Sequence, residues 1–177
     1  MSPMRPMTPD DILRERAQAL ARPVAQPPRA DLLQVLEFRI AGQAYAVETR
    51  HAAEVVALDE LTPVPCTPAF VLGVFNLRGR ITTLVEIRSF LGLSQRGLSD
   101  LGQVVVVRGA GLEFGFVCDR IDGVAACAVD ELQAPIVQAA VAGARHLKGL
   151  TPQGRLLLDL DSLLADPALI VHKESHP

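Results

Sequence analysis

The sequence predicts a mainly β protein that is built from small β-barrels. Three observations support this prediction: many short apolar segments, tight turns that contain glycine, and helical patterns that are all brief. Strands and longer helices do not alternate along the chain, which argues against a parallel α/β sheet. With 177 residues, of which 49% are hydrophobic, the chain is long enough for one sizeable domain or two small lobes that share a core.

The first predicted element of the barrels is a hairpin over residues 36–47. Apolar and polar side chains alternate from Leu36 to Ile40, at the period of two that is typical of a half-buried strand. Residues 41–43 predict a turn, and the alternation resumes at Tyr45.

Two short helices are predicted next. In the segment after the hairpin the spacing is helical rather than strand-like, with Ala52, Val55 and Val56 on one side and Glu54 facing elsewhere. The stretch 61–66 is too rich in proline for a central strand, because proline donates no hydrogen bond to a ladder.

The second of these helices is predicted directly after the prolines. Thr67 and Pro68 are suited to cap and begin a helix over residues 68–72, which Gly73 would end.

Two apolar segments at 74–77 and 81–87 predict two strands joined by a tight turn at Arg78, Gly79 and Arg80. A charge inside an apolar, β-branched run is expensive unless the chain turns there or another group pairs with it. The sequence therefore raises the question of what Arg78 does.

The rest of the chain continues the pattern of strands and glycine turns. The predicted elements are a helical turn that ends at Gly92, a polar loop at 94–102, a strand at 104–107, a turn at 109–111 and a strand at 114–119. A break at Asp122 and Gly123 precedes an apolar segment at 124–129. Residues 151–166 predict a closing turn, strand and short helix.

Residues 1–30 are predicted to be an extension rather than part of the core. Six of the 13 prolines lie before residue 29, and residues 22–30 have the composition of an extended linker. Thr8 as N-cap and Pro9 at the first helical position predict a short amphipathic helix, which either docks on a partner or frays in water. At the other end, residues 173–177 are predicted to be a polar tail.

The composition excludes several classes of function. No stretch approaches the roughly 20 uninterrupted apolar residues that cross a bilayer, and the first residues lack the pattern of a secretory signal, so we expect a cytoplasmic protein without membrane insertion. The net charge of −3, the absence of tryptophan and the single tyrosine argue against nucleic-acid binding. No glycine-rich loop has the spacing that binds nucleotide phosphates.

The cysteines and histidines leave one catalytic hypothesis open. Cys66, Cys118 and Cys127 are odd in number and lack CxxC spacing, so neither a disulfide framework nor a zinc site is indicated. A small hydrolase or transferase that uses Cys66 or Cys118 with a histidine such as His51 is the alternative function, and it requires a thiol of lowered pKa in a pocket.

Four aspartates beside turns are the remaining candidates for chemistry: Asp119, Asp122, Asp159 and Asp161. At strand ends aspartate commonly caps backbone N–H groups, so we expect this role rather than a catalytic or metal-binding one. No catalytic residue, metal or cofactor is therefore predicted.

The segment PVPCTPAFVLGVFNLRGRITTLVEIRSFLGL resembles the signature of the CheW family, the adaptors that couple chemoreceptors to the histidine kinase CheA. Four further segments are similar to that family: FRIAGQAYAVE, FGFVCDRIDGVAACAVDEL, HLKGL and GRLLLDLDSLL. The resemblance covers residues 35–166, and we place the CheW-like domain at residues 31–172.

The resemblance implies a fold of two SH3-like five-stranded β-barrels with short helices, packed side by side with a hydrophobic groove between them. It also implies a non-catalytic scaffold that takes part in chemotaxis signalling. The implied partners are the regulatory domain of a CheA-type histidine kinase and the cytoplasmic tip of methyl-accepting chemoreceptors, with other array proteins as candidate partners of residues 1–30. The expected location is the cytoplasm, with recruitment to membrane-associated or soluble receptor arrays.

The same resemblance singles out residues of a partner-binding surface. In the family, a glutamate in the first short helix, here Glu54, is thought to pair with the arginine of the NLRG motif, here Arg78, near the receptor-binding surface. The candidate interface residues are Glu54, Val55, Val56, Asn76, Arg78, Gly79 and Gly149. The simpler alternative is that Arg78 only caps a hairpin turn that faces solvent.

The chain departs from the family pattern at several positions. Val55 and Val56 stand where many members have isoleucine and arginine, Thr83 stands in place of a proline, and Glu86 replaces an aspartate. The missing arginine bears on the receptor contact, whereas threonine for proline affects only a strand edge.

Overall fold

The computed structural model describes residues 31–94, 102–134 and 144–169. The predicted helix and linker of residues 1–30, the polar tail at 173–177 and most of the polar loop at 94–102 lie outside these residues. The strands are β1 (Leu32–Ile40), β2 (Gln43–Glu48), β3 (Ala52–Ala57), β4 (Val71–Leu77), β5 (Arg80–Val85), β6 (Gln103–Gly109), β7 (Leu112–Cys118), β8 (Arg120–Ala128), β9 (Leu147–Leu150) and β10 (Leu156–Leu158). The helices are the α-helix α2 (Leu160–Leu164) and three 3₁₀ turns, η1 (Ile87–Ser89), η3 (Val129–Glu131) and η4 (Ala144–His146).

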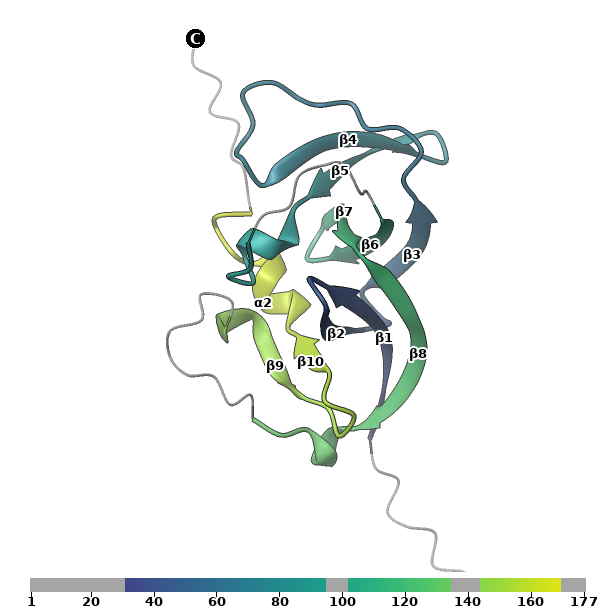
Figure 1. The fold of residues 1–177 in the computed structure, drawn as a ribbon, viewed down its shortest axis with the longest axis vertical. Helices are drawn as coiled ribbons and strands as arrows, with labels where there is room; N and C mark the ends of the chain where they lie inside the picture. The colour runs from purple at the N-terminus through teal and green to yellow at the C-terminus, as the bar shows by residue number, and fades with distance from the viewer. Residues whose placement is uncertain (1–30, 95–101, 135–143, 170–177) are drawn as a thin grey trace, which may run out of the picture. The chain divides into compact units, whose positions relative to one another are not determined.

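The strands form two five-stranded sheets, which confirms the mainly β prediction (Figure 1). The first sheet has the order β8-β1-β2-β10-β9 and the second the order β3-β6-β7-β5-β4. Neighbouring strands are antiparallel except for β10 with β2 and β5 with β7, which are parallel. In each sheet a hairpin is thus extended by a strand from a distant part of the chain.

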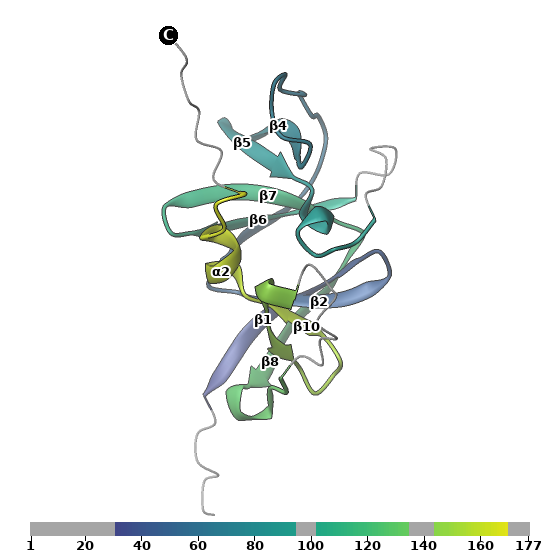
Figure 2. The ribbon, with the colours of Figure 1, turned by 90° about the vertical axis from the view of Figure 1, so that its left-hand side faces the viewer.

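One apolar cluster contains residues from both sheets. Phe38 on β1 and Phe116 on β7 are fully buried, and their ring centroids lie 5.3 Å apart. Leu160, Leu163 and Leu164 of α2 are buried in the same cluster, and Figure 2 shows α2 at the level where the sheets meet. Asp159 precedes α2 and caps it, since its Oδ1 accepts a hydrogen bond from the Ser162 N–H at 3.0 Å, as expected for an aspartate beside a turn.

The predicted hairpins and the closing strand and helix are confirmed. β1 and β2 pair through a turn at Ala41 and Gly42, and β4 pairs with β5 through Arg78 and Gly79. Both residues of each turn have positive φ, which is the type I′ geometry that matches the twist of a hairpin.

The predicted helix around Glu54 is wrong, because these residues form β3. Val55 lies opposite Val105 of β6, and a bulge between Ala52 and Glu54 shifts the register. As a result Glu54 and Val56 are the more buried side chains and Val55 is exposed, whereas the helical prediction grouped the two valines. β-Branched residues pack well in a ladder, and this pairing with a distant strand outweighs the local spacing.

The predicted helix at 68–72 is also wrong. A short turn, closed by a hydrogen bond from Val71 N–H to Pro68 O at 2.9 Å, leads directly into β4. Gly73 therefore lies within a strand instead of ending a helix, and its neighbour Val74 exchanges two backbone hydrogen bonds with Thr62, each 2.8 Å long.

The predicted break at Asp122 and Gly123 is wrong as well. β8 runs without interruption from Arg120 to Ala128 along β1, and a register shift between Glu37 and Phe38 absorbs the irregularity. Glycine within a strand often marks such a bulge.

Gly73 supplies a test of this fold. A Cβ at this position would lie 2.4 Å from Thr62 O, and φ is +151°. We predict that Gly73→Ala lowers the free energy of unfolding by about 2–3 kcal/mol, because strain and overpacking add. Chemical denaturation measures this loss.

The matched control is Gly154→Ala. Gly154 has φ +75°, but apart from its two neighbours in the chain no atom of the described residues lies within 4 Å of its added Cβ. This variant should lose only about 1 kcal/mol, the conformational cost alone. Equal losses for the two variants would contradict the close approach of Thr62 to β4.

Candidate functional site: the open seam of the second sheet

The second sheet is closed across its two end strands by an ion pair. β3 and β4 stand at opposite ends of the strand order. Glu54 projects from β3, Arg78 stands at the tip of the β4–β5 turn, and the Arg78 Nη2 atom lies 2.6 Å from Glu54 Oε1. The predicted pairing of these two residues is thus present, and we call the gap that it spans the seam.

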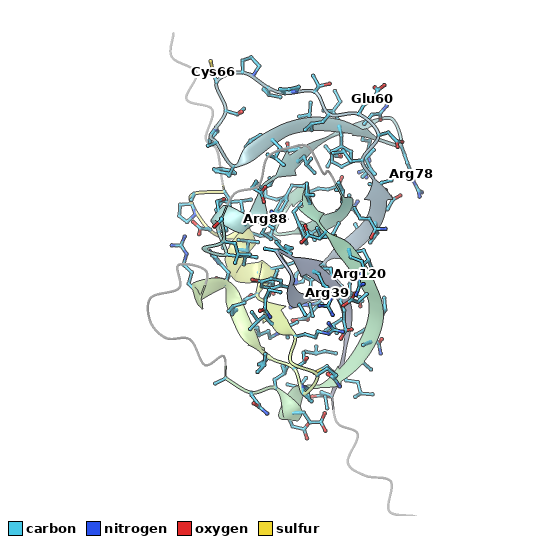
Figure 3. All side chains as sticks on the ribbon, in the orientation of Figure 1. Arg39, Glu60, Cys66, Arg78, Arg88 and Arg120 are labelled. Carbon is cyan, nitrogen blue, oxygen red and sulfur yellow. The ribbon has the colours of Figure 1, made fainter. Side chains whose placement is uncertain are left out.

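The two partners of this pair differ in exposure. The Arg78 side chain is 80% exposed and that of Glu54 only 22%. The carboxylate is therefore held at the wall of the sheet while the guanidinium remains accessible to solvent and to other molecules (Figure 3).

The turn holds Arg78 in an unusual backbone conformation. Arg78 has φ +50° and Gly79 φ +84°, and left-handed φ is uncommon for a residue with a long side chain. The Asn76 Oδ1 atom accepts a hydrogen bond from the Gly79 N–H at 2.7 Å.

The seam contains a pocket of about 480 Å³. Its lining residues come from β3, β4, the β4–β5 turn and the segment after β3: Glu54, Val56, Ala57, Asp59, Glu60, Phe75, Asn76, Leu77 and Arg78. Apolar side chains of both strands thus contribute a surface that is flanked by three carboxylates and one guanidinium. Figure 3 shows Glu60 and Arg78 on the same side of the sheet.

An exposed apolar side chain adjoins the tip of the hairpin. Ile81 is 82% exposed and lies opposite Asn76 in the β4–β5 register. Val55, on the outward side of β3, is 38% exposed. An apolar group beside an accessible charge is typical of a protein-binding surface.

The predicted interface residues are only partly brought together. Four of the seven line the seam pocket: Glu54, Val56, Asn76 and Arg78. Gly79 forms the turn, and Val55 faces outward. Gly149 lies in β9 of the other sheet, where an added Cβ would meet Gln133 O at 3.1 Å, so it is not part of the seam.

A second surface was missed by the sequence analysis. On one face of the paired strands β1 and β8, Leu32 and Val124 are 62% and 63% exposed, and Gln34 and Ala126 between them are also exposed. We call this face the β1–β8 ribbon. The sequence carries no clear signal for this face, because residues 124–126 are all apolar and do not alternate, and the predicted break at Gly123 hid the length of the strand.

The aspartates 119 and 122 have structural partners. Asp119 Oδ2 accepts a hydrogen bond from Ala41 N–H at 2.6 Å, and Asp119 Oδ1 pairs with Arg88 at 2.6 Å. Asp122 pairs with three arginines instead of capping backbone groups: Arg39, Arg120 and Arg155. Side-chain hydrogen bonds from Arg120 and Arg39 hold the pKa of Asp122 below its usual value.

Within the described residues, the contacts of the cysteines do not match the expected nucleophilic site. Burial raises the pKa of the Cys118 thiol to about 12 and also raises the pKa of Cys127. Cys66 is exposed, whereas His51 is buried with its Nδ1 3.3 Å from Arg108 O. The lining of the seam pocket contains neither cysteine nor histidine.

The described residues contain neither a cluster of metal ligands nor a long apolar helix. In the described ranges, no group of three or more His, Cys, Asp or Glu side chains is placed to hold a metal ion. Among the same residues, no helix combines the length and apolar character needed to span a bilayer.

His146 is a buried titratable group outside the seam. It is 2% exposed, with its Nε2 atom 3.0 Å from Asp166 Oδ2 and its Nδ1 atom 3.4 Å from Ser162 Oγ of α2. Desolvation, followed by the charge of Arg145, lowers the pKa of His146, and Asp166 opposes this effect only in part.

We predict that the domain loses stability as the pH falls through about 6.5, the ordinary pKa of histidine. Because the pKa of His146 is lowered in the folded protein, the unfolded chain binds more protons between that pKa and 6.5, so the unfolded state gains as the pH falls through this range. The free energy of unfolding at a series of pH values measures this loss. A His146→Asn variant should show a shallower decline, and an unchanged slope would contradict the role of His146.

The chain is similar to known proteins over most of its described length. A family model described as "CheW-like domain" matches residues 34–168. The chain is 34% identical over 136 residues to the chemotaxis protein CheW of Thermotoga maritima, which covers 75% of this chain and 88% of that protein. It is 27% identical over 143 residues to the chemotaxis protein CheW of Treponema pallidum, with 77% of this chain and 84% of that protein covered.

A solved structure shows the same fold. The scaffolding protein TtCheW of Thermoanaerobacter tengcongensis matches with a TM-score of 0.62 at 22% identity, over 71% of this chain and 86% of that one. This likeness, with the two five-stranded sheets, confirms the predicted architecture of two small β-barrels.

Proposed function

This chain belongs to the family of CheW-like domains, and on this premise we propose that it is a non-catalytic adaptor that couples chemoreceptors to a CheA-type histidine kinase in a chemosensory array. The observation that carries the proposal is the Glu54–Arg78 pair at the seam, because it combines a fixed carboxylate with an accessible guanidinium beside exposed apolar side chains. We expect the protein to act in the cytoplasm, recruited to receptor arrays.

An adaptor must bind two partners, and the two sheets offer two separate surfaces. The seam belongs to the second sheet, and the β1–β8 ribbon belongs to the first. The seam is charged and has a pocket. The ribbon is uncharged and mostly apolar, and its strand β8 is the edge strand of the first sheet. Such different surfaces suit different partners.

We assign the cytoplasmic tip of a chemoreceptor to the seam. An exposed ion pair contributes only about 0–1 kcal/mol to stability, so we assign the pair a role in recognition: Glu54 holds Arg78 in place, and the exposed guanidinium offers its other N–H groups to a carboxylate of the partner. The pocket beside it provides apolar surface for the same partner.

We assign the regulatory domain of the kinase to the β1–β8 ribbon. An exposed sheet edge beside an apolar face is a surface that a partner of similar fold can extend or cover. Leu32 and Val124 would lie at the centre of this contact.

The alternative of a cysteine-dependent hydrolase or transferase lacks support from the site. A thiol with a pKa of about 12, as at Cys118, is not a nucleophile near neutral pH. The exposed Cys66 lies on a loop, and the contacts of His51 are to Arg108 and Asp161. We therefore favour the adaptor.

Charge reversal at the seam tests the receptor assignment. We predict that Arg78→Glu weakens binding of a soluble receptor-tip fragment by about tenfold or more, because it places two carboxylates together. Adding Glu54→Arg in the same molecule should restore part of the affinity by forming the inverted pair. Pull-down with the two single variants and the double variant gives the answer.

Two controls accompany this cycle. Kinase binding should change less than receptor binding, and a thermal unfolding scan should show that each variant is folded. Strictly additive losses in the double variant would mean that the two residues are not coupled in binding. Arg78 would then be only the residue of a hairpin turn.

The kinase assignment predicts a modest affinity. Titration calorimetry with the regulatory domain of the cognate kinase should give a dissociation constant of about 1 µM, as is usual for transient signalling complexes. Val124→Asp should weaken this binding by about tenfold, because it puts a charge on the apolar ribbon. The control is Ile81→Asp, at an apolar position of the other sheet that is 82% exposed, against 63% for Val124. No heat and no co-elution at high concentration would sink the assignment.

A further inference from the structure

We infer that Asn76 is a positioning residue of the seam: its side chain fixes the β4–β5 turn so that Arg78 reaches Glu54. The inference rests on the proposed function insofar as it concerns receptor binding. Its geometric part depends only on the ion pair and the turn.

The turn places Arg78 where arginine is not favoured. Two other hairpin turns of the molecule have the same pair of positive φ angles, at Ala41–Gly42 and Ala110–Gly111, and both have a small residue at the position that Arg78 occupies. Left-handed backbone costs about 1–2 kcal/mol for a residue other than glycine, and asparagine and aspartate tolerate it best. An arginine at such a position indicates that the placement of its side chain matters more than the cost of the turn.

Asn76 supplies a bond that opposes this cost. Its Oδ1 atom accepts the Gly79 N–H at 2.7 Å, so the second residue of the turn is tied to the strand that enters it. Short polar side chains often stabilise turns through such local bonds to the backbone. Here the bond restricts the backbone of the turn to which the Arg78 side chain is attached.

The direction of Arg78 depends on this restriction. From the hairpin tip the guanidinium must cross to β3, at the opposite end of the strand order, to meet Glu54 at 2.6 Å. A long side chain on a loosened turn would sample many directions and meet a fixed carboxylate less often. Asn76 therefore acts through Arg78.

The competing role for Asn76 is direct contact with the partner, since it is exposed and lines the seam pocket. The two roles differ in one respect. A positioning residue has no effect once Arg78 is absent, whereas a contact residue keeps its effect.

The first experiment measures geometry without any partner. Asn76→Ala should speed hydrogen exchange of the Gly79 amide. It should also reduce the coupling free energy between Glu54 and Arg78, which is obtained from the unfolding free energies of the wild type, Glu54→Ala, Arg78→Ala and the double variant. Asn76→Asp keeps an acceptor oxygen and should restore slow exchange. Gln43→Ala removes an exposed amide beside the Ala41–Gly42 turn and is the matched control. Unchanged exchange and coupling in Asn76→Ala would overturn the inference.

The second experiment measures affinity for a soluble receptor-tip fragment. Loss of one hydrogen bond of about 0.5–1.5 kcal/mol corresponds to about a 2- to 10-fold weaker affinity for Asn76→Ala. The same change should cost nothing further in an Arg78→Ala background, and Asn76→Asp should retain most of the affinity. An equal loss in both backgrounds would make Asn76 a contact residue and overturn the inference.

The two experiments fail in different ways. If Arg78→Ala leaves receptor affinity intact, the proposed receptor site is wrong, and the exchange and coupling measurements still decide the role of Asn76. If those measurements fail while Arg78→Ala weakens binding, the receptor site stands and Asn76 has no positioning role.

Discussion

The contact between Phe38 of β1 and Phe116 of β7 is the packing interaction on which the rest of the molecule depends. Both rings are fully buried, they belong to different sheets, and the leucines of α2 are buried in the same cluster. Burial of each ring contributes about 1.5–3 kcal/mol, and neither small sheet has a comparable cluster of its own. Because the inner faces of the two sheets pack against each other in this cluster, the seam and the β1–β8 ribbon lie outside it and remain available to partners.

Two ion pairs illustrate how the surroundings decide what a charge does. Arg88 is 5% exposed and pairs with Asp119, which also holds the β1–β2 turn, so this pair ties the second sheet to the first. Loss of Asp119 would be costly because the Arg88 guanidinium is buried, whereas the Asp119 side chain is 30% exposed, so little water can replace this partner of the arginine. The Glu54–Arg78 pair is accessible and adds little stability. This difference supports our proposal that Arg78 serves recognition rather than folding.

Local patterns were sufficient for the hairpins but not for the strand that carries the site. Alternation in β1 and glycine at the type I′ turns are signals within a few residues, and the structure follows them. The helical spacing around Glu54 was misleading, because what makes β3 a strand is its pairing with β6, some fifty residues away. Gly73 and Gly123 were interpreted as ends of elements, yet each lies inside a strand, where close approach or a bulge requires it. The Glu54–Arg78 pair was found through family resemblance, since spacing alone does not place two ends of a sheet together.

We propose that the surfaces on the two sheets bind two different partners at once. Sedimentation velocity of the wild-type protein with a soluble receptor-tip fragment and the kinase regulatory domain, each at concentrations above its own dissociation constant, tests this proposal. We expect a ternary complex whose mass is the sum of the three components. Competition, in which addition of one partner releases the other and no ternary species forms, would contradict it.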